Sequence, residues 1–105
     1  MVIRGGENIY CSEVETCLHK IDEILECSVF GVFDDRLGEE VGVCIFREKA
    51  SNLSGEDIRD FCSEHMAKHK IPKYIWFNNE PLPRNANGKF LKRELRDSLD
   101  IRDAV

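Results

Sequence analysis

The chain has 105 residues, enough for one domain that buries roughly 60 to 70% of its unfolded surface without a metal or disulfides. An apolar content of 42% and a charged content of 33% are ordinary for a globular domain, and no apolar run approaches the ~20 residues that span a bilayer. The net charge of -5 disfavours nucleic acid as a partner. The first residues lack the charged and apolar regions of a secretory signal, which favours the cytosol.

The first third of the chain predicts a strand, a turn and a helix. Residues 2–4 can extend as a short strand that breaks at Gly5-Gly6. Ser12 and Glu15 have the spacing of a capping box, so we expect a helix to begin there and to bury a stripe at helical spacing. That stripe comprises Val14, Cys17, Leu18 and Ile21.

The middle of the chain predicts a hairpin followed by a second helix. Residues 27–33 and 41–46 are two apolar strands separated by a polar loop, which indicates an antiparallel pair. Residues 54–57 open a helix with apolar positions at helical spacing, and Pro72 prevents it from continuing.

The last third predicts one more strand and a terminal helix. Residues 74–77 are rich in β-formers, and a helix beginning near Phe90 has Leu91, Leu95 and Leu99 on one face. The sequence therefore predicts a single domain over residues 1–105 of α+β (α/β) class. We expect a short mixed or antiparallel sheet of about three strands plus a short strand pair, flanked by three helices.

Five cysteines are present, at positions 11, 17, 27, 44 and 62. No two of them form a Cys-x-x-Cys pair, and the three histidines lack a metal-binding motif, so neither zinc nor a disulfide framework is expected. We expect reduced and largely buried thiols, and no metal site.

The loop over residues 83–89 reads Pro-Arg-Asn-Ala-Asn-Gly-Lys and precedes the terminal helix. Pro83 fixes its own φ, while Gly88 and the two asparagines tolerate left-handed backbone, so the loop is shaped and can present Lys89 to an anion. Residues 84–96 hold five cations against Glu94 alone. This local basic patch suits a phosphate-bearing small molecule better than nucleic acid, although a solvated helix face would also explain the cations that follow Lys89.

A second segment, residues 4–15, reads Arg-Gly-Gly-Glu-Asn-Ile-Tyr-Cys-Ser-Glu-Val-Glu. Together the two segments resemble the carboxy-terminal domain of the adenylate-forming acyl- and aryl-CoA ligases, the AMP-binding enzyme superfamily. The resemblance covers essentially the whole chain, and Cys11 stands where that family usually has proline.

The resemblance implies an ATP-dependent carboxylic acid–CoA ligase in which Lys89 stabilises the charge of adenylation. Gly5, Gly6, Glu7 and Asn8 would lie near coenzyme A in the thioester step, although an ordinary turn would also explain them. ATP with Mg²⁺ would bind a large amino-terminal domain that also holds the acyl pocket. That domain would be the partner of this one, and the chain alone is expected to be inactive.

Three alternatives stay open. The chain could be a free-standing accessory module that acts in trans with an adenylating enzyme or binds coenzyme A. It could belong to a relative that loads a carrier-protein thiol. A lysine acetyltransferase could also act on Lys89 and remove its charge.

Overall fold

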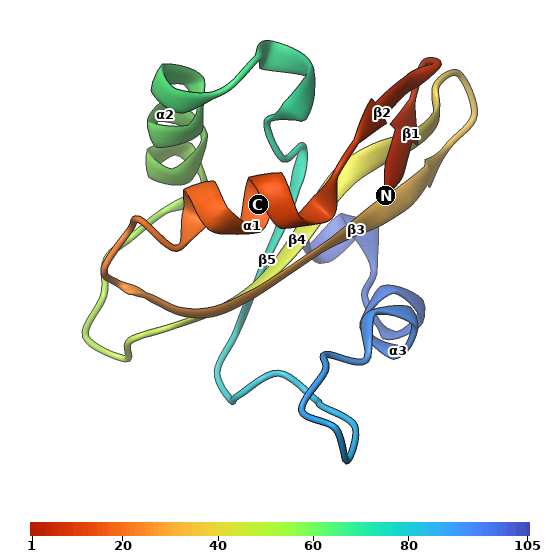
Figure 1. Cartoon of the computed structure of the whole chain (residues 1–105). Coiled ribbons are helices and arrows are strands. Elements are labelled where there is room, and N and C mark those ends of the chain that lie inside the picture. The colour runs from red at the N-terminus through yellow and green to blue at the C-terminus, as the bar shows by residue number, and fades with distance from the viewer.

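In the computed structural model, which describes residues 1–105, two long antiparallel strands organise one five-stranded sheet (Figure 1). They are β3 (Ile24–Asp34) and β4 (Gly38–Arg47). Strand β5 (Tyr74–Asn78) runs parallel to β4 along its other edge. The predicted hairpin is confirmed, although both strands are longer than predicted because the polar residues beside the turn also pair.

A short hairpin extends the sheet beside the first residue of β4. Strand β1 (Val2–Arg4) pairs with β2 (Glu7–Ile9), and Arg4 pairs with Gly38 at the start of β4. The expected strand pair is therefore present, and it belongs to the same sheet as the three longer strands. The α+β class is confirmed.

Two hydrophobic clusters lie on the two faces of the sheet because side chains alternate along each strand. Helices α1 (Cys11–Leu18) and α2 (Gly55–His65) cover the larger cluster, which includes Val29 of β3 and Val43 of β4. Helix α3 (Lys92–Ser98) covers the smaller one, where Leu95 packs near Trp76. Two 3₁₀ turns complete the fold, η1 (Lys68–Lys70) and η2 (Ile101–Asp103).

The helix starts confirm one sequence prediction and correct two. Helix α2 begins after Ser54 with a capping box shared with Asp57, as expected. The predicted capping box at Ser12 is wrong, because Ser12 lies inside α1 and the Glu15 carboxylate turns away to accept from the backbone of β3. Helix α3 begins at Lys92, later than expected, because Phe90 still pairs with the opposite side of its loop.

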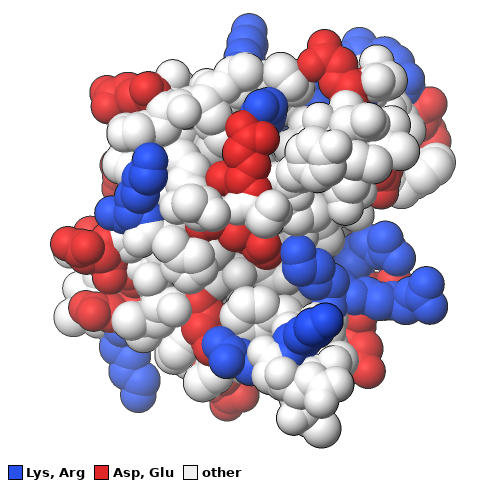
Figure 2. Space-filling model, in the orientation of Figure 1, with Lys and Arg blue, Asp and Glu red and all other residues white.

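Charged side chains are distributed unevenly over the surface. Figure 2 shows Lys and Arg gathered at the right, over α3, while Asp and Glu predominate at the left edge of the same view. The basic patch predicted for residues 84–96 is thus a feature of the folded surface. No helix is long and apolar enough to cross a membrane.

Candidate functional site

The loop that ends in Lys89 is closed by its own hydrogen bonds. The Asn85 side-chain oxygen accepts from the backbone N–H of Asn87 at 2.9 Å and of Lys89 at 3.0 Å. The Asn85 N–H donates to the Lys89 carbonyl at 2.8 Å, and Gly88 takes the left-handed φ of +81° that this turn requires. The loop is therefore shaped, as its composition predicts.

The side chain of Lys89 is free on the returning side of this loop, opposite Asn85. Lys89 is exposed, and its ammonium makes no hydrogen bond or ion pair within the chain. Three other cations of the basic patch are engaged, since Arg84 pairs with Glu26, Lys92 with Glu15, and Arg96 lies beside Asp97, whereas Arg93 is exposed and unpaired. A fixed backbone with an uncompensated ammonium is suited to receive an anion from outside the chain.

The base of the loop is held by Glu26 of β3, a residue that the sequence analysis did not single out. The Glu26 carboxylate accepts from the Leu82 N–H at 2.8 Å and pairs with the Arg84 guanidinium. Arg84 also lies over the Phe90 ring, 4.6 Å from its centroid. Because Glu26 and Arg84 are separated by 58 residues, no local pattern could have predicted this contact.

The Gly5-Gly6 segment is the two-residue turn between β1 and β2. Gly5 has φ +55° and Gly6 has φ +87°, the pair of positive values that a tight hairpin turn with the sheet's own twist requires. The Gly5 N–H donates to the Leu37 carbonyl at 2.8 Å, which joins this turn to the one between β3 and β4. Glu7 and Asn8 lie in strand β2 and are exposed, so neither caps a helix.

The two segments do not form one site within this domain. Figure 1 shows the β1–β2 turn at the upper right and the loop before α3 at the bottom, at opposite ends of the molecule. The loop that carries Lys89 and the Gly5-Gly6 turn are therefore separate parts of the domain's surface.

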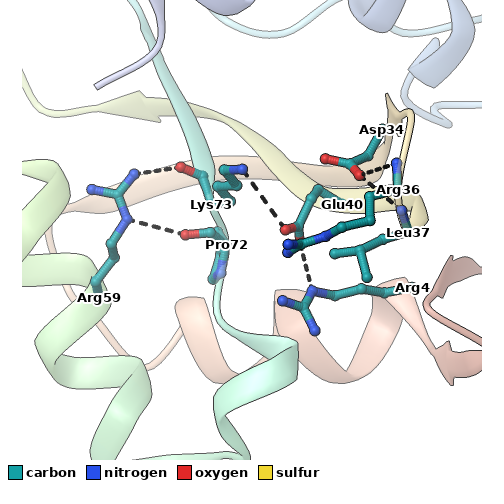
Figure 3. A network of polar contacts seen from close by, with 8 residues as sticks. All are labelled: Arg4, Asp34, Arg36, Leu37, Glu40, Arg59, Pro72 and Lys73. Carbon is teal, nitrogen blue, oxygen red and sulfur yellow. Dashed lines mark hydrogen bonds and ion pairs between the residues drawn. The ribbon is translucent and has the colours of Figure 1, made fainter.

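A buried carboxylate supports the β1–β2 turn. Glu40 is 5% exposed, accepts from Arg4 Nε and lies 4.0 Å from Lys73 Nζ (Figure 3). Arg59 of α2 donates to the carbonyls of Pro72 and Lys73, so the segment leading into β5 is fixed on both sides. Arg4 and Lys73 are thus occupied within the domain.

The 3₁₀ turn η1 lies against the segment that follows the two glycines. His69 Nε2 is 2.9 Å from Glu7 Oε2, and Lys70 Nζ is 2.7 Å from Glu13 Oε1. Among the lysines of this region only Lys68 is exposed without an ion pair. The sequence left the partners of these cations open, and the structure assigns most of them to carboxylates of this chain.

Most of the cysteine thiols are buried, and Cys27 Sγ lies 3.5 Å from His19 Nε2. Burial raises the pKa of the Cys27 and Cys62 thiols to about 12 and that of Cys44 to about 11. Cys11 is half-exposed and the other four cysteines are buried, which confirms the expected burial of most of the thiols. No group of three or more His, Cys, Asp or Glu side chains could hold a metal ion.

Comparison with known protein families shows which family the chain belongs to. The profile described as the AMP-binding enzyme C-terminal domain matches residues 13–89. The chain belongs to this family. The match begins after the β1–β2 hairpin and ends on Lys89. It therefore contains the three longer strands β3, β4 and β5 and the lysine loop, but not β1 and β2.

Relatives of the domain are CoA ligases. Over 100 residues it is 42% identical to the mitochondrial medium-chain acyl-CoA ligase ACSF2 of Rattus norvegicus, covering 95% of this chain and 16% of the relative. It is 41% identical to the 2-succinylbenzoate–CoA ligase of Bacillus cereus, covering 95% of this chain and 20% of that enzyme. The domain therefore spans a fifth or less of the length of these relatives.

Solved structures share the fold. ATP-bound MatB from Rhodopseudomonas palustris superposes with a TM-score of 0.87 at 32% identity, over 93% of this chain and 19% of MatB. The o-succinylbenzoate–CoA synthetase MenE of Bacillus subtilis, solved with its acyl-adenylate intermediate, gives 0.84 at 35% identity, over 93% of this chain and 20% of MenE. In each, the domain corresponds to a small part of a much larger chain.

Proposed function

We propose that this domain is the mobile carboxy-terminal part of an ATP-dependent, AMP-forming carboxylic acid–CoA ligase, and that Lys89 serves the adenylation step. The observation that carries this proposal is the free ammonium of Lys89 on a closed loop. The names of the relatives, which are acyl-CoA and 2-succinylbenzoate–CoA ligases, support the reaction class.

Adenylation brings a carboxylate against the α-phosphate of ATP before pyrophosphate leaves, so two anionic groups must approach each other. A compact ammonium between them lowers the energy of this arrangement without transferring a proton. The hydrogen bond from the Lys89 N–H to Asn85 fixes the backbone, so that only the side chain must be ordered when substrate binds.

The Gly5-Gly6 turn is proposed to serve the thioester step. Both glycines are exposed, and nothing lies within 4 Å of the position that a Gly6 Cβ would occupy. The pantetheine arm of coenzyme A could therefore approach the backbone closely there, with Glu7 and Asn8 beside it. Since this turn and Lys89 lie at opposite ends, the domain would rotate between the two half-reactions (Figure 1).

Substrates and partners follow from this proposal. ATP, with Mg²⁺, and the acyl group would be held by a large amino-terminal domain against which this domain closes, and coenzyme A would be the acceptor. The names of the relatives favour coenzyme A, and not a carrier protein, as the acceptor. They also favour a fatty acid or another carboxylic acid as the source of the acyl group. The proposed compartment is the cytosol, whereas the relatives named ACSF2 are mitochondrial.

Exposure of Lys89 also makes it a proposed target of acetylation, which would remove the charge that adenylation uses. Mass analysis of Lys89 in protein isolated from cells tests this. A peptide carrying only unmodified Lys89 under all growth conditions would reject it.

The test of the proposed function is replacement of Lys89 in the full-length enzyme that carries this domain. Lys89→Ala and Lys89→Arg should each lower adenylation, measured by ATP–pyrophosphate exchange, by a factor on the order of 10² or more, because arginine keeps the charge but not the compact shape. Lys49→Ala is the matched control, because Lys49 is exposed and makes no ion pair. Near-normal exchange by Lys89→Ala would reject the role.

A further inference from the structure

We propose that Glu26 is a positioning residue for Lys89, because its carboxylate fixes the direction in which the lysine loop leaves the sheet. This inference rests on the proposed function of Lys89 in adenylation. Glu26 belongs to β3, near the end of the sheet from which the loop emerges, and it lies far along the chain from the loop that it holds.

The Glu26 carboxylate contacts the loop where it begins. One oxygen accepts from the Leu82 N–H at 2.8 Å, and the other pairs with the Arg84 guanidinium. The Glu26 side chain is 17% exposed and that of Arg84 is 46% exposed, so water screens the ion pair more than the hydrogen bond from Leu82. Leu82 is itself buried in the cluster under α3, which makes the beginning of the loop continuous with the core.

Arg84 links the beginning of the loop to its end, because it also contacts Phe90. Its guanidinium lies over the ring of Phe90, 4.6 Å from the centroid, and its backbone pairs with Phe90 as an antiparallel bridge. Phe90 directly follows Lys89, and Asn85, which binds the Lys89 N–H, directly follows Arg84. Arg84 therefore contacts Phe90, the residue after Lys89, and directly precedes Asn85, the residue that binds the Lys89 backbone.

A local irregularity of β3 directs Glu26 towards the loop. The β3–β4 register shifts between Ile24 and Glu26, so that Leu25 is an extra residue in the strand. Because of this bulge Ile24 enters the cluster under α1 and α2, while Glu26 two residues later faces the opposite side. In a regular strand the two side chains would share a face, and bulges re-aim side chains in this way beside functional sites.

The experiment measures both half-reactions of the full-length enzyme with Glu26→Gln. Adenylation by pyrophosphate exchange should fall at least tenfold in kcat, because displacement of Lys89 by about 1 Å is costly. Thioester formation from supplied acyl-adenylate should stay within about twofold, since the Gly5-Gly6 turn at the other end is not touched. Glu80→Gln is the matched control, because Glu80 is exposed near the same loop and makes no ion pair.

A second readout reports on the loop itself. Amide hydrogen exchange over residues 82–91 should become faster in Glu26→Gln than in Glu80→Gln, while exchange in α1 and α2 stays unchanged. Arg84→Met removes the ion pair from the exposed partner and should give the same selective loss of adenylation if Glu26→Gln does not fold.

Equal loss in both half-reactions would show a general structural role and would overturn the positioning role. So would normal adenylation in both Glu26→Gln and Arg84→Met. If Lys89→Ala lowers adenylation and these variants do not, only the present inference fails. If Lys89→Ala leaves adenylation unchanged, the proposed function fails and the role of Glu26 fails with it.

Discussion

Lys92 in α3 and Glu15 in α1 meet across the open edge of β3, where Lys92 Nζ lies 3.1 Å from Glu15 Oε2. Between them, Val29 donates its N–H to the same Glu15 oxygen at 2.9 Å and accepts from Lys92 at 2.9 Å through its carbonyl. Two side chains thus satisfy backbone groups that an edge strand would otherwise expose to another chain. The contact also joins the helix after the Gly5-Gly6 segment to the helix after the Lys89 loop.

Replacing Lys92 by methionine should destabilise the domain by about 1 kcal/mol, since one charge-assisted hydrogen bond and a partly solvated ion pair are lost while the aliphatic stem is kept. The measurement is the free energy of unfolding from urea denaturation. Arg93→Met is the control, because Arg93 is exposed and unpaired and should change little. Equal stability of the two variants would mean that the Lys92 contacts contribute nothing in solution.

Replacing the buried Glu40 by glutamine should lower the free energy of unfolding by about 1 to 2 kcal/mol, because the carboxylate would lose its charge-assisted contact with Arg4, while the half-exposed Lys73 contributes less. Thermal or urea unfolding measures the loss. The matched change Glu48→Gln removes an exposed, unpaired carboxylate and should be close to neutral. A loss no greater than that of Glu48→Gln would contradict the importance of this pair.

Substitutions at Gly6 should separate backbone strain from ligand access. Gly6→Ala should destabilise the domain by roughly 1 kcal/mol because of the φ of +87°, whereas Gly6→Asn should cost less since asparagine tolerates that region. If close approach of coenzyme A requires the missing Cβ, both variants should slow thioester formation more than adenylation. Normal thioester formation by Gly6→Asn would assign the glycine to the turn alone.

The buried thiols predict a loss of stability at alkaline pH. Burial, together with the smaller effect of the Glu15 carboxylate and against that of Lys92, raises the pKa of Cys27 to about 12 from the value near 9 of a solvated thiol. Because the folded pKa lies above the unfolded one, this thiol's contribution is complete below pH 9 and is lost as the pH rises towards 12. Urea unfolding between pH 8 and 11 should show this decline, and it should be shallower in Cys27→Ala. A parallel decline in both proteins would exclude the thiol as a cause.

Reactivity of the cysteines follows from the same burial. At pH 8 an alkylating reagent should modify the half-exposed Cys11 first, while Cys27, Cys44 and Cys62 react only after denaturation, because their thiolates are scarce and enclosed. Peptide mass analysis after brief labelling identifies the modified residue. Rapid native labelling of Cys62 would contradict the packing of α2 against the sheet.

Local chemistry in the sequence predicted the elements whose causes are themselves local. Two apolar segments separated by a polar loop predicted the β3–β4 hairpin, and residues 54–57 predicted the start of α2. The same reasoning failed at Ser12. The Glu15 carboxylate that would complete its capping box finds a backbone N–H fourteen residues away on β3, a contact that exists only after α1 has packed.

The lysine loop also combines features that local sequence determines with a contact that only the folded structure provides. Pro83, Asn85 and Gly88 determine by themselves that the loop is tight and that Lys89 directly follows its turn, because φ restrictions and short-range hydrogen bonds act within a few residues. Only the tertiary structure decided what holds that loop. Glu26 lies 56 positions before Leu82 in the sequence, and only folding of the sheet, with the bulge in β3, brings the Glu26 carboxylate within hydrogen-bonding distance of the loop.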